Sequence, residues 1–139
     1  MRVNCVANDP KALADHQQSR AVPFEGVYPL TVGKVYVAVG MTIAERALYF
    51  LVRDDSGGPS FVPAGFFELF TAPIPEGWRF GLELGIRATG RELWAEPGVA
   101  TWGYPELVED PAHVQSLFEF DPDALDVFEA HIAAAEAAS

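Results

Sequence analysis

A serine in an acidic, glycine-rich stretch is the first residue of this chain whose setting could support catalysis. Ser56 lies in "RDDSGGPSF", residues 53–61. A serine becomes a nucleophile only where a histidine accepts its proton and an acid orients that histidine. The three histidines stand at positions 16, 113 and 131, so only His16 precedes Ser56 in the chain.

The surroundings of Ser56 differ from the serine motif of chymotrypsin-like proteases, which is Gly-Asp-Ser-Gly-Gly-Pro. Asp54 replaces the first glycine, and "LADHQQ" around His16 does not match the Ala-Ala-His-Cys setting of the histidine in those enzymes. The chain is also too short for the two barrels between which their active site lies. Because Asp, Ser and two glycines between apolar runs are typical of a tight turn, the sequence predicts a turn here and no catalytic residue.

Patterns that bind metal ions or nucleotides are incomplete in this chain. Asp54 and Asp55 are adjacent, but no further acids follow at the spacing of a calcium loop. The histidines form no zinc-binding pair, and the glycine-rich stretches lack the phosphate-binding motifs. Cys5 is the single cysteine, so no internal disulfide can form, and its alternation with Val3 and Ala7 predicts a buried thiol in a strand. The sequence predicts no metal ion and no cofactor.

Residues 28–100 have the alternation that is typical of short β-strands. "KVYVAVGMTI", with Val35, Val37 and Val39 on one face, and "RALYFLVRD" predict two strands. "DDSGGP" predicts the turn that follows, and Pro63 in "SFVPAGFFELF" marks a strand end or a sheet edge.

The clearest strand prediction covers residues 78–87. Apolar residues at every second position predict one face in the core, and the alternate positions predict a face in solvent. We expect "ATGR" to turn, "ELWAE" to return as the partner strand and "PGVATWGYP" to lead out as a loop. The apolar positions are Trp78, Phe80, Leu82, Leu84 and Ile86.

Two Asp-Pro pairs, at 110–111 and 121–122, predict two C-terminal helices. Aspartate is a preferred N-cap, and proline is well tolerated at the first helical position. In the second helix Leu125, Phe128 and Ile132 form a stripe that we expect to pack on the sheet, and we expect the acids to stay outside. Those acids are Asp123, Asp126 and Glu129.

The expected fold is α+β, with one domain over residues 1–139. A twisted, mainly antiparallel sheet or small SH3-like barrel over 28–100 precedes an acidic helical part over 105–139. Residues 8–29, with prolines at 10, 23 and 29, predict a long connection with one helical turn near "PKALADH". The start lacks the apolar run of a signal peptide, and no run reaches the roughly 18–20 apolar residues of a membrane span. We therefore expect a soluble, cytoplasmic protein.

The net charge of −11 is confined to the end of the chain. Acids and bases balance up to Arg91, and no Lys or Arg follows it. The resulting negative potential should repel nucleic acids and anionic membranes and attract basic surfaces. The sequence therefore predicts a basic protein partner and no binding to nucleic acid or membrane.

Three stretches resemble a group of small bacterial proteins: "YPLTVGKVYVAVGMTI", "LYFLVRDDSGGPSFVPAGFFELF" and "WGYPELVEDP" with the closing helix. In that group a Leu-Thr-x-Gly-Lys-x-Tyr strand is followed by a strand ending in Asp-Asp, a turn and a Pro-Ala-x-x-Phe-Glu segment. Residues 28–70 are similar to an SH3-like barrel, and acidic proteins of this kind resemble immunity proteins, which neutralise toxins of interbacterial competition. The resemblance implies a non-enzymatic protein that binds a toxin.

The leading functional prediction is accordingly an immunity-type protein, not an enzyme, whose acidic C-terminal part docks on a basic toxin. Two alternatives stay open. One is a small hydrolase or ligand-binding enzyme with a pocket between sheet and helices, lined by Trp78, Trp102 and Tyr104. The other is a soluble domain whose acidity serves solubility alone. Trp102 and Tyr104 are either interface anchors or part of a secondary core. The predicted partner-binding residues are Trp102, Tyr104, Glu106, Glu109, Asp110, Glu119, Asp121 and Asp123.

Overall fold

The longest strand, β2 (Val35–Ala44), organises the sheet. Along one edge it pairs with β3 (Ala47–Arg53), which in turn pairs with β4 (Pro59–Pro63). Both pairings are antiparallel, and the two predicted strands and Pro63 at a strand end are confirmed. The structure is a computed structural model that describes residues 1–13, 26–44, 47–69, 72–83 and 99–138.

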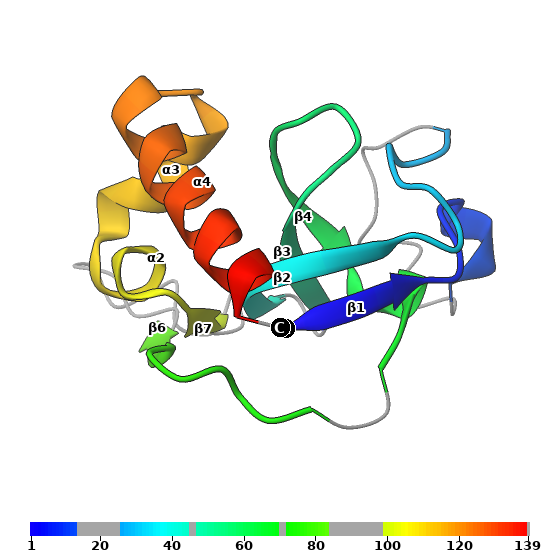
Figure 1. Cartoon of the computed structure of the whole chain (residues 1–139), viewed down its shortest axis with the longest axis horizontal. Coiled ribbons are helices and arrows are strands. Elements are labelled where there is room, and N and C mark those ends of the chain that lie inside the picture. The colour runs from blue at the N-terminus through cyan, green and yellow to red at the C-terminus, as the bar shows by residue number, and fades with distance from the viewer. Residues whose placement is uncertain (14–25, 45–46, 70–71, 84–98, 139) are drawn as a thin grey trace, which may run out of the picture.

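Two strands share the other edge of β2. β1 (Arg2–Cys5) pairs with its first residues and β7 (Val99–Gly103) with its last ones. β5 (Phe67–Glu68) adds to β1, and β6 (Arg79–Glu83) adds to β7 (Figure 1). The described strands form an antiparallel sheet that is not closed, so the α+β fold is confirmed in its sheet form and not as a small barrel.

The central strands bury side chains on both faces of the sheet. In β2, Tyr36 and Ala38 belong to one buried cluster, and Val37 and Val39 belong to a second one on the opposite face. β3 alternates in the same way. Such strands are apolar at nearly every position because each face needs its own cover. The structure covers one face with helices and the other with loops and short strands.

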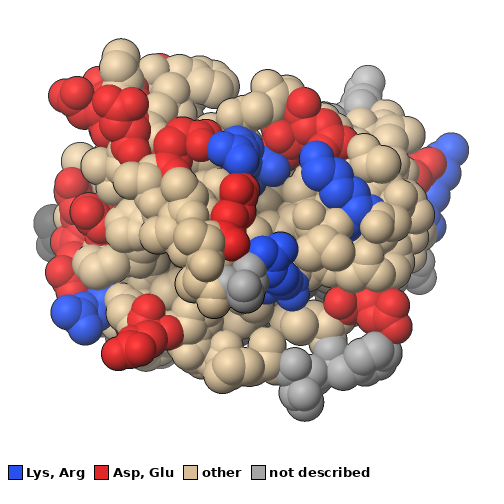
Figure 2. Space-filling view, viewed as in Figure 1, with Lys and Arg blue, Asp and Glu red and all other residues tan. Residues whose placement is uncertain are grey.

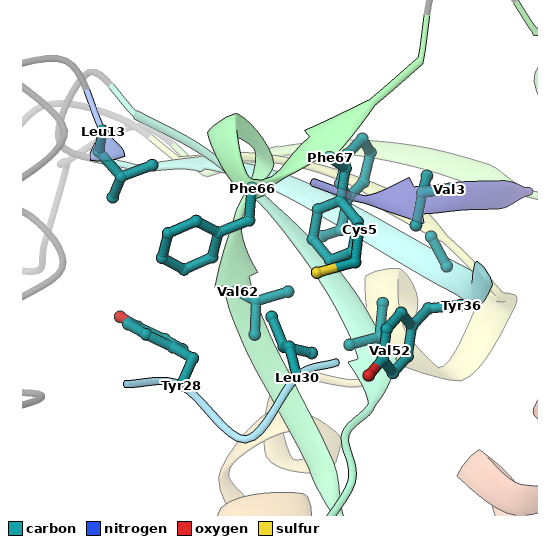
Figure 3. Packing of buried hydrophobic residues seen from close by; sticks show 12 residues of the cluster. Val3, Cys5, Leu13, Tyr28, Leu30, Tyr36, Val52, Val62, Phe66 and Phe67 are labelled. Atoms are coloured by element: carbon teal, nitrogen blue, oxygen red, sulfur yellow. The ribbon is translucent and has the colours of Figure 1, made fainter. Parts of the chain in front are cut away.

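The first cluster lies under the loop before β2 and the turn between β4 and β5 (Figure 3). Tyr28 meets Phe66 edge to face, with ring centroids 5.0 Å apart. Cys5 is only 1% exposed, and Figure 3 shows its sulfur pointing into the cluster. Burial raises the pKa of the Cys5 thiol, so the thiol form is favoured. The predicted buried thiol in a strand is confirmed.

The stretch around Ser56 is the turn between β3 and β4. The Asp54 carboxylate accepts hydrogen bonds from the Ser56 amide, at 2.9 Å, and from its hydroxyl. Gly57 adopts a φ of 92°, which glycine tolerates at little cost. The predicted turn is confirmed, and the hydroxyl of Ser56 is engaged by Asp54 rather than by a histidine.

The next residue, Asp55, joins this turn to the segment before β2. Its carboxylate accepts hydrogen bonds from the Thr31 hydroxyl at 2.6 Å and the Tyr36 hydroxyl at 2.7 Å, and it pairs with Lys34 at 3.0 Å. The hydrogen bond from Thr31, supported by those from Tyr36 and Lys34, lowers the pKa of Asp55. The adjacent aspartates are therefore turn and bracing residues in the described structure.

Strands β6 and β7 correct two predictions. Residues 99–103, expected in a loop, form β7 and take the place next to β6 that was expected for "ELWAE", which lies outside the described residues. The apolar face of β6 is not in the core: Phe80 and Leu82 are 56% and 60% exposed. The other face is covered instead, because Gly81 lies so close to Val108 that an added Cβ would come within 2.7 Å of it. Leu84 and Ile86 lie outside the described residues.

Three helices follow β7 and lie together on one face of the sheet (Figure 1). α3 (Pro111–Phe118) and α4 (Pro122–Ala137) confirm the two predicted helices, and a short helix, α2 (Pro105–Glu109), precedes them. Phe128 and Ile132 of α4 are buried against the sheet as expected, whereas Leu125 is only partly buried. None of the described helices is long and apolar enough to cross a membrane.

The connection over residues 8–29 is described only at its two ends. Asp9 caps a single 3-10 turn, η1 (Pro10–Ala12), by accepting a hydrogen bond from the Lys11 amide. The predicted helical turn therefore exists, and residues 14–25 lie outside the described ones. Leu13 and Tyr28 are buried in the first cluster, so both described ends contribute to the core.

Candidate protein-binding face

The three helices and their caps, which we call the helical layer, carry most of the excess negative charge. The layer covers residues 104–138 and contains no Lys or Arg. Every acidic residue in it except Glu129 is exposed, and Glu129 is half-buried. Figure 2 shows acidic side chains spread over the side of the molecule where Figure 1 places these helices. The structure therefore turns the charge asymmetry of the sequence into an acidic face.

Two of the predicted partner-binding acids cap helices. The Asp110 side chain accepts a hydrogen bond from the Ala112 amide at 3.0 Å, at the start of α3. Asp121 accepts one from the Ala124 amide at 3.1 Å, at the start of α4. Both carboxylates also meet the positive end of a helix dipole. Each has a structural role in addition to its contribution to the surface charge.

Ion pairs engage other acids of the layer. Glu109 accepts from Arg79 of β6 at 3.0 Å, and Arg53 of β3 contacts both Glu129 and Glu136, the latter at 3.0 Å. All of these side chains are more than a third exposed, so each pair contributes at most about 1 kcal/mol. These pairs connect the helices to the sheet and partly neutralise the face near α2 and the end of α4.

The acids near the junction of α3 and α4 have no basic partner among the described residues. Glu119 accepts a hydrogen bond from Gln115 at 3.0 Å, and Asp123 and Asp126 lie exposed one turn apart on α4. The strongest uncompensated negative potential of the helical layer is therefore expected at this junction.

Trp102 and Tyr104 do not lie together. Trp102 is the cross-strand partner of Phe80, with ring centroids 4.7 Å apart, on the face of β7 that points away from α2. Tyr104 follows β7, caps α2 and is only 2% exposed within the second cluster. The loop predicted for both is corrected, and Tyr104 is a core residue in this structure. Trp102 and Tyr104 do not line a common pocket, because β7 ends at Gly103 and the chain turns into α2, which places Tyr104 in the second cluster.

Tyr104 is the centre of a cluster of titratable side chains between the three helices. Its hydroxyl hydrogen bonds to His113 Nε2 at 2.6 Å, and its ring stacks on His131 with centroids 4.3 Å apart. His131 Nε2 lies 3.0 Å from Glu106 Oε1. Burial raises the pKa of Tyr104 well above its usual range and lowers the pKa of His113. The pKa of Glu106 is lowered, first by its own backbone amide and then by His131.

These shifts keep Tyr104 and His113 neutral near pH 7, which suits a buried hydrogen-bonded pair. Both side chains are nearly inaccessible to solvent, with Tyr104 2% and His113 5% exposed. Within the described residues no group of three His, Cys, Asp or Glu side chains could hold a metal ion. The hydrogen bonds and ring stacking of this cluster therefore connect the three helices.

The stability of the protein is expected to fall as the pH drops below about 6.5, in part through His113. Its folded pKa is lowered, so the unfolded chain binds the proton more readily and the folded state loses its advantage below the unfolded pKa. Urea unfolding is compared at about pH 7.5 and about pH 5.5. His113→Gln, which can still hydrogen bond to Tyr104, should lose less stability between these two pH values than the native chain. An equal loss in both chains would contradict this assignment.

An open groove of about 280 Å³ lies where the sheet meets the end of α4. Arg2, Lys34 and Arg53 line it, and in Figure 2 basic side chains stand there beside acidic ones. Each of the three already has an acceptor: Lys34 pairs with Asp55, Arg53 with two glutamates of α4, and Arg2 donates to the Glu136 carbonyl at 3.2 Å. The neighbouring carboxylates therefore partly neutralise the basic side chains that line the groove.

Sequence analysis missed two exposed aromatic residues on this face. Phe118 and Phe120 are 45% and 65% exposed at the junction of α3 and α4. Phe118 is the last residue of α3, and Phe120 lies between α3 and α4. The signal that could have found them is the alternation of aromatic and acidic residues in "FEFDPD" directly before a second Asp-Pro start.

Comparison with known protein families, with curated proteins and with solved structures finds no match for this chain.

Proposed function

We propose that this chain is a non-enzymatic binding protein whose helical layer docks on a basic protein surface. One observation carries the proposal: a layer of three helices, without Lys or Arg, exposes nearly all of its acids on one side of the molecule. The form of this function that the resemblance implies is an immunity-type protein that neutralises a basic toxin.

The physical basis of such docking is electrostatic steering. A concentrated negative potential raises the rate at which a positively charged partner arrives in the right orientation, and the effect weakens as salt screens the charges. The acids at the junction of α3 and α4 should contribute most, because no described Lys or Arg neutralises them. Acids already paired with Arg53 or Arg79 should contribute less.

The test uses a lysine/serine peptide as a defined basic probe. Asp123→Asn with Asp126→Asn should slow association with this peptide by about threefold or more at low salt and reduce the salt dependence of the rate, measured by stopped-flow fluorescence. The matched control is Glu68→Gln with Glu76→Gln, which removes the same charge from exposed positions outside the helical layer.

Equal effects of the two double variants would contradict the proposal, since the acidity would then act without a defined face. The toxin form is tested with basic proteins encoded beside this chain's gene. Coexpression with the native chain should protect cells from such a protein if it is a toxin, and the Asp123 and Asp126 variant should protect less. If none of these basic proteins bound the chain and none was neutralised by it, the chain would not be an immunity protein for them.

A further inference from the structure

The residue after α3 has a backbone conformation that is unusual for its type. Phe120 has a φ of 58°, and among the described residues no other non-glycine residue has a positive φ. The Phe120 amide donates to the Leu117 carbonyl at 3.1 Å, and the Asp121 amide donates to the Ser116 carbonyl at 3.0 Å. This pair of bonds is the Schellman ending of a helix, in which glycine usually occupies the left-handed position. A phenylalanine there is disfavoured by contact between its Cβ and the backbone.

The conformation is not explained by burial of the ring. Phe120 is 65% exposed, and its ring edge lies near Gly58 of the β3–β4 turn, where a Cβ added to that glycine would come within 3.6 Å of it. The neighbouring Asp121 already caps α4, so the course of the chain through the junction is set by the two helices. A glycine would satisfy this turn with less strain. Strained, exposed side chains of this kind point to a binding role.

The surroundings of Phe120 have the layout of a protein-binding hot spot. Phe118 lies beside it in the chain and packs against Phe61 of β4, with ring centroids 5.7 Å apart. The exposed acids Glu119, Asp121 and Asp123 flank the two rings. Interfaces commonly have aromatic anchors at the centre and charged residues at the rim.

We infer that Phe120, supported by Phe118, is the apolar anchor of the acidic face, and that the partner presents an apolar patch bordered by lysines and arginines. This inference rests on the proposed function and adds the anchor to it. Charge complementarity selects the partner: the acids next to both rings would repel an acidic or anionic surface around the same apolar patch. Phe80 and Leu82 of β6 are also exposed and serve as the comparison.

The experiment compares two peptides of equal length and equal lysine content. In one, leucines form an apolar stripe along an amphipathic helix, and in the other serines replace them. Affinities for the full chain are measured by fluorescence anisotropy. The native chain should bind the lysine/leucine peptide about tenfold more tightly than the lysine/serine peptide. Phe120→Gly should remove most of that difference, Phe118→Ser should reduce it, and the control Phe80→Ser should leave it unchanged.

Folding is monitored by the melting temperature of each variant. Because glycine adopts a positive φ freely, Phe120→Gly should melt at or above the temperature of the native chain, so weaker binding cannot result from unfolding. Should Phe120→Gly lower the melting temperature, Phe120→Asn, which also tolerates the left-handed region, is used in its place.

The outcomes separate the anchor from the proposed function. The anchor is wrong if Phe120→Gly still prefers the leucine peptide, or if the preference is lost in Phe80→Ser instead. In that case, slower association of the Asp123 and Asp126 variant would still support electrostatic docking. A preference lost in Phe120→Gly supports the anchor. If the acid variants then bind as the native chain does, the anchor stands and the electrostatic proposal fails.

Discussion

Phe128→Ala is expected to lower the free energy of unfolding by about 3–5 kcal/mol. Phe128 is fully buried at the centre of the second cluster, where α4 meets the β2 side chains Val37 and Val39. Removing the ring loses its transfer free energy and leaves a cavity that the rigid sheet cannot fill. Urea unfolding followed by circular dichroism at pH 7 measures the change.

The matched control is Phe118→Ala, the same substitution ten positions earlier in the chain. Phe118 is 45% exposed, so its removal should cost about 1 kcal/mol or less, mainly through its contact with Phe61. Comparable losses for the two variants would show that α4 is not fastened to the sheet through Phe128. A large loss confined to Phe128→Ala agrees with the described packing.

Gly103→Ala should destabilise the protein by about 1–3 kcal/mol, because the helical layer and the neighbouring strand leave no room for a side chain at this glycine. A Cβ added to Gly103 would lie 2.6 Å from Leu107 Cδ2 and 3.0 Å from both the Gly40 Cα and the Val39 carbonyl oxygen. The leucine can move, but the two backbone atoms belong to the paired strand β2 and cannot. Thermal unfolding and proteolysis of the α2 region measure the effect.

Gly58→Ala provides the control for this substitution. A Cβ at Gly58 would meet only the Phe120 ring edge, at an ordinary contact distance of 3.6 Å, so the stability should change by less than about 0.5 kcal/mol. If Gly103→Ala were as mild as Gly58→Ala, α2 would not be seated on the β2–β7 pair. The prediction for the helical layer would then be wrong.

Local signals in the sequence determined the elements whose conformation depends on near neighbours. Asp110 and Asp121, each followed by proline, predicted the starts of α3 and α4, and both side chains make the capping bonds. The Asp-Ser-Gly-Gly turn was predictable because Asp54 and Gly57 satisfy its geometry within a few residues. The acidic character of the helical layer follows from composition alone, since no base occurs after Arg91.

Pairing and covering over long distances in the chain decided the rest. Alternation in "RFGLE" showed that β6 has two different faces but not which of them α2 would cover. Because Gly81 has no side chain, α2 packs closely against the less apolar face. Residues 99–103 lacked a strong strand pattern, yet β7 forms because both β2 and β6 supply hydrogen-bonding partners. The pairing of β7 with β2 joins residues more than fifty positions apart in the chain, so local propensity does not reveal it.

The candidate face shows the same division. Charge and helix capping are local properties, so the residues alone were enough to predict an acidic, helical face. Which residues this face presents depends on how the helices pack: Tyr104 is buried in the core as a partner of His113, and Phe120 is exposed after the end of α3. Burial of an aromatic side chain depends on what packs over it, and that is set by the arrangement of the helices on the sheet.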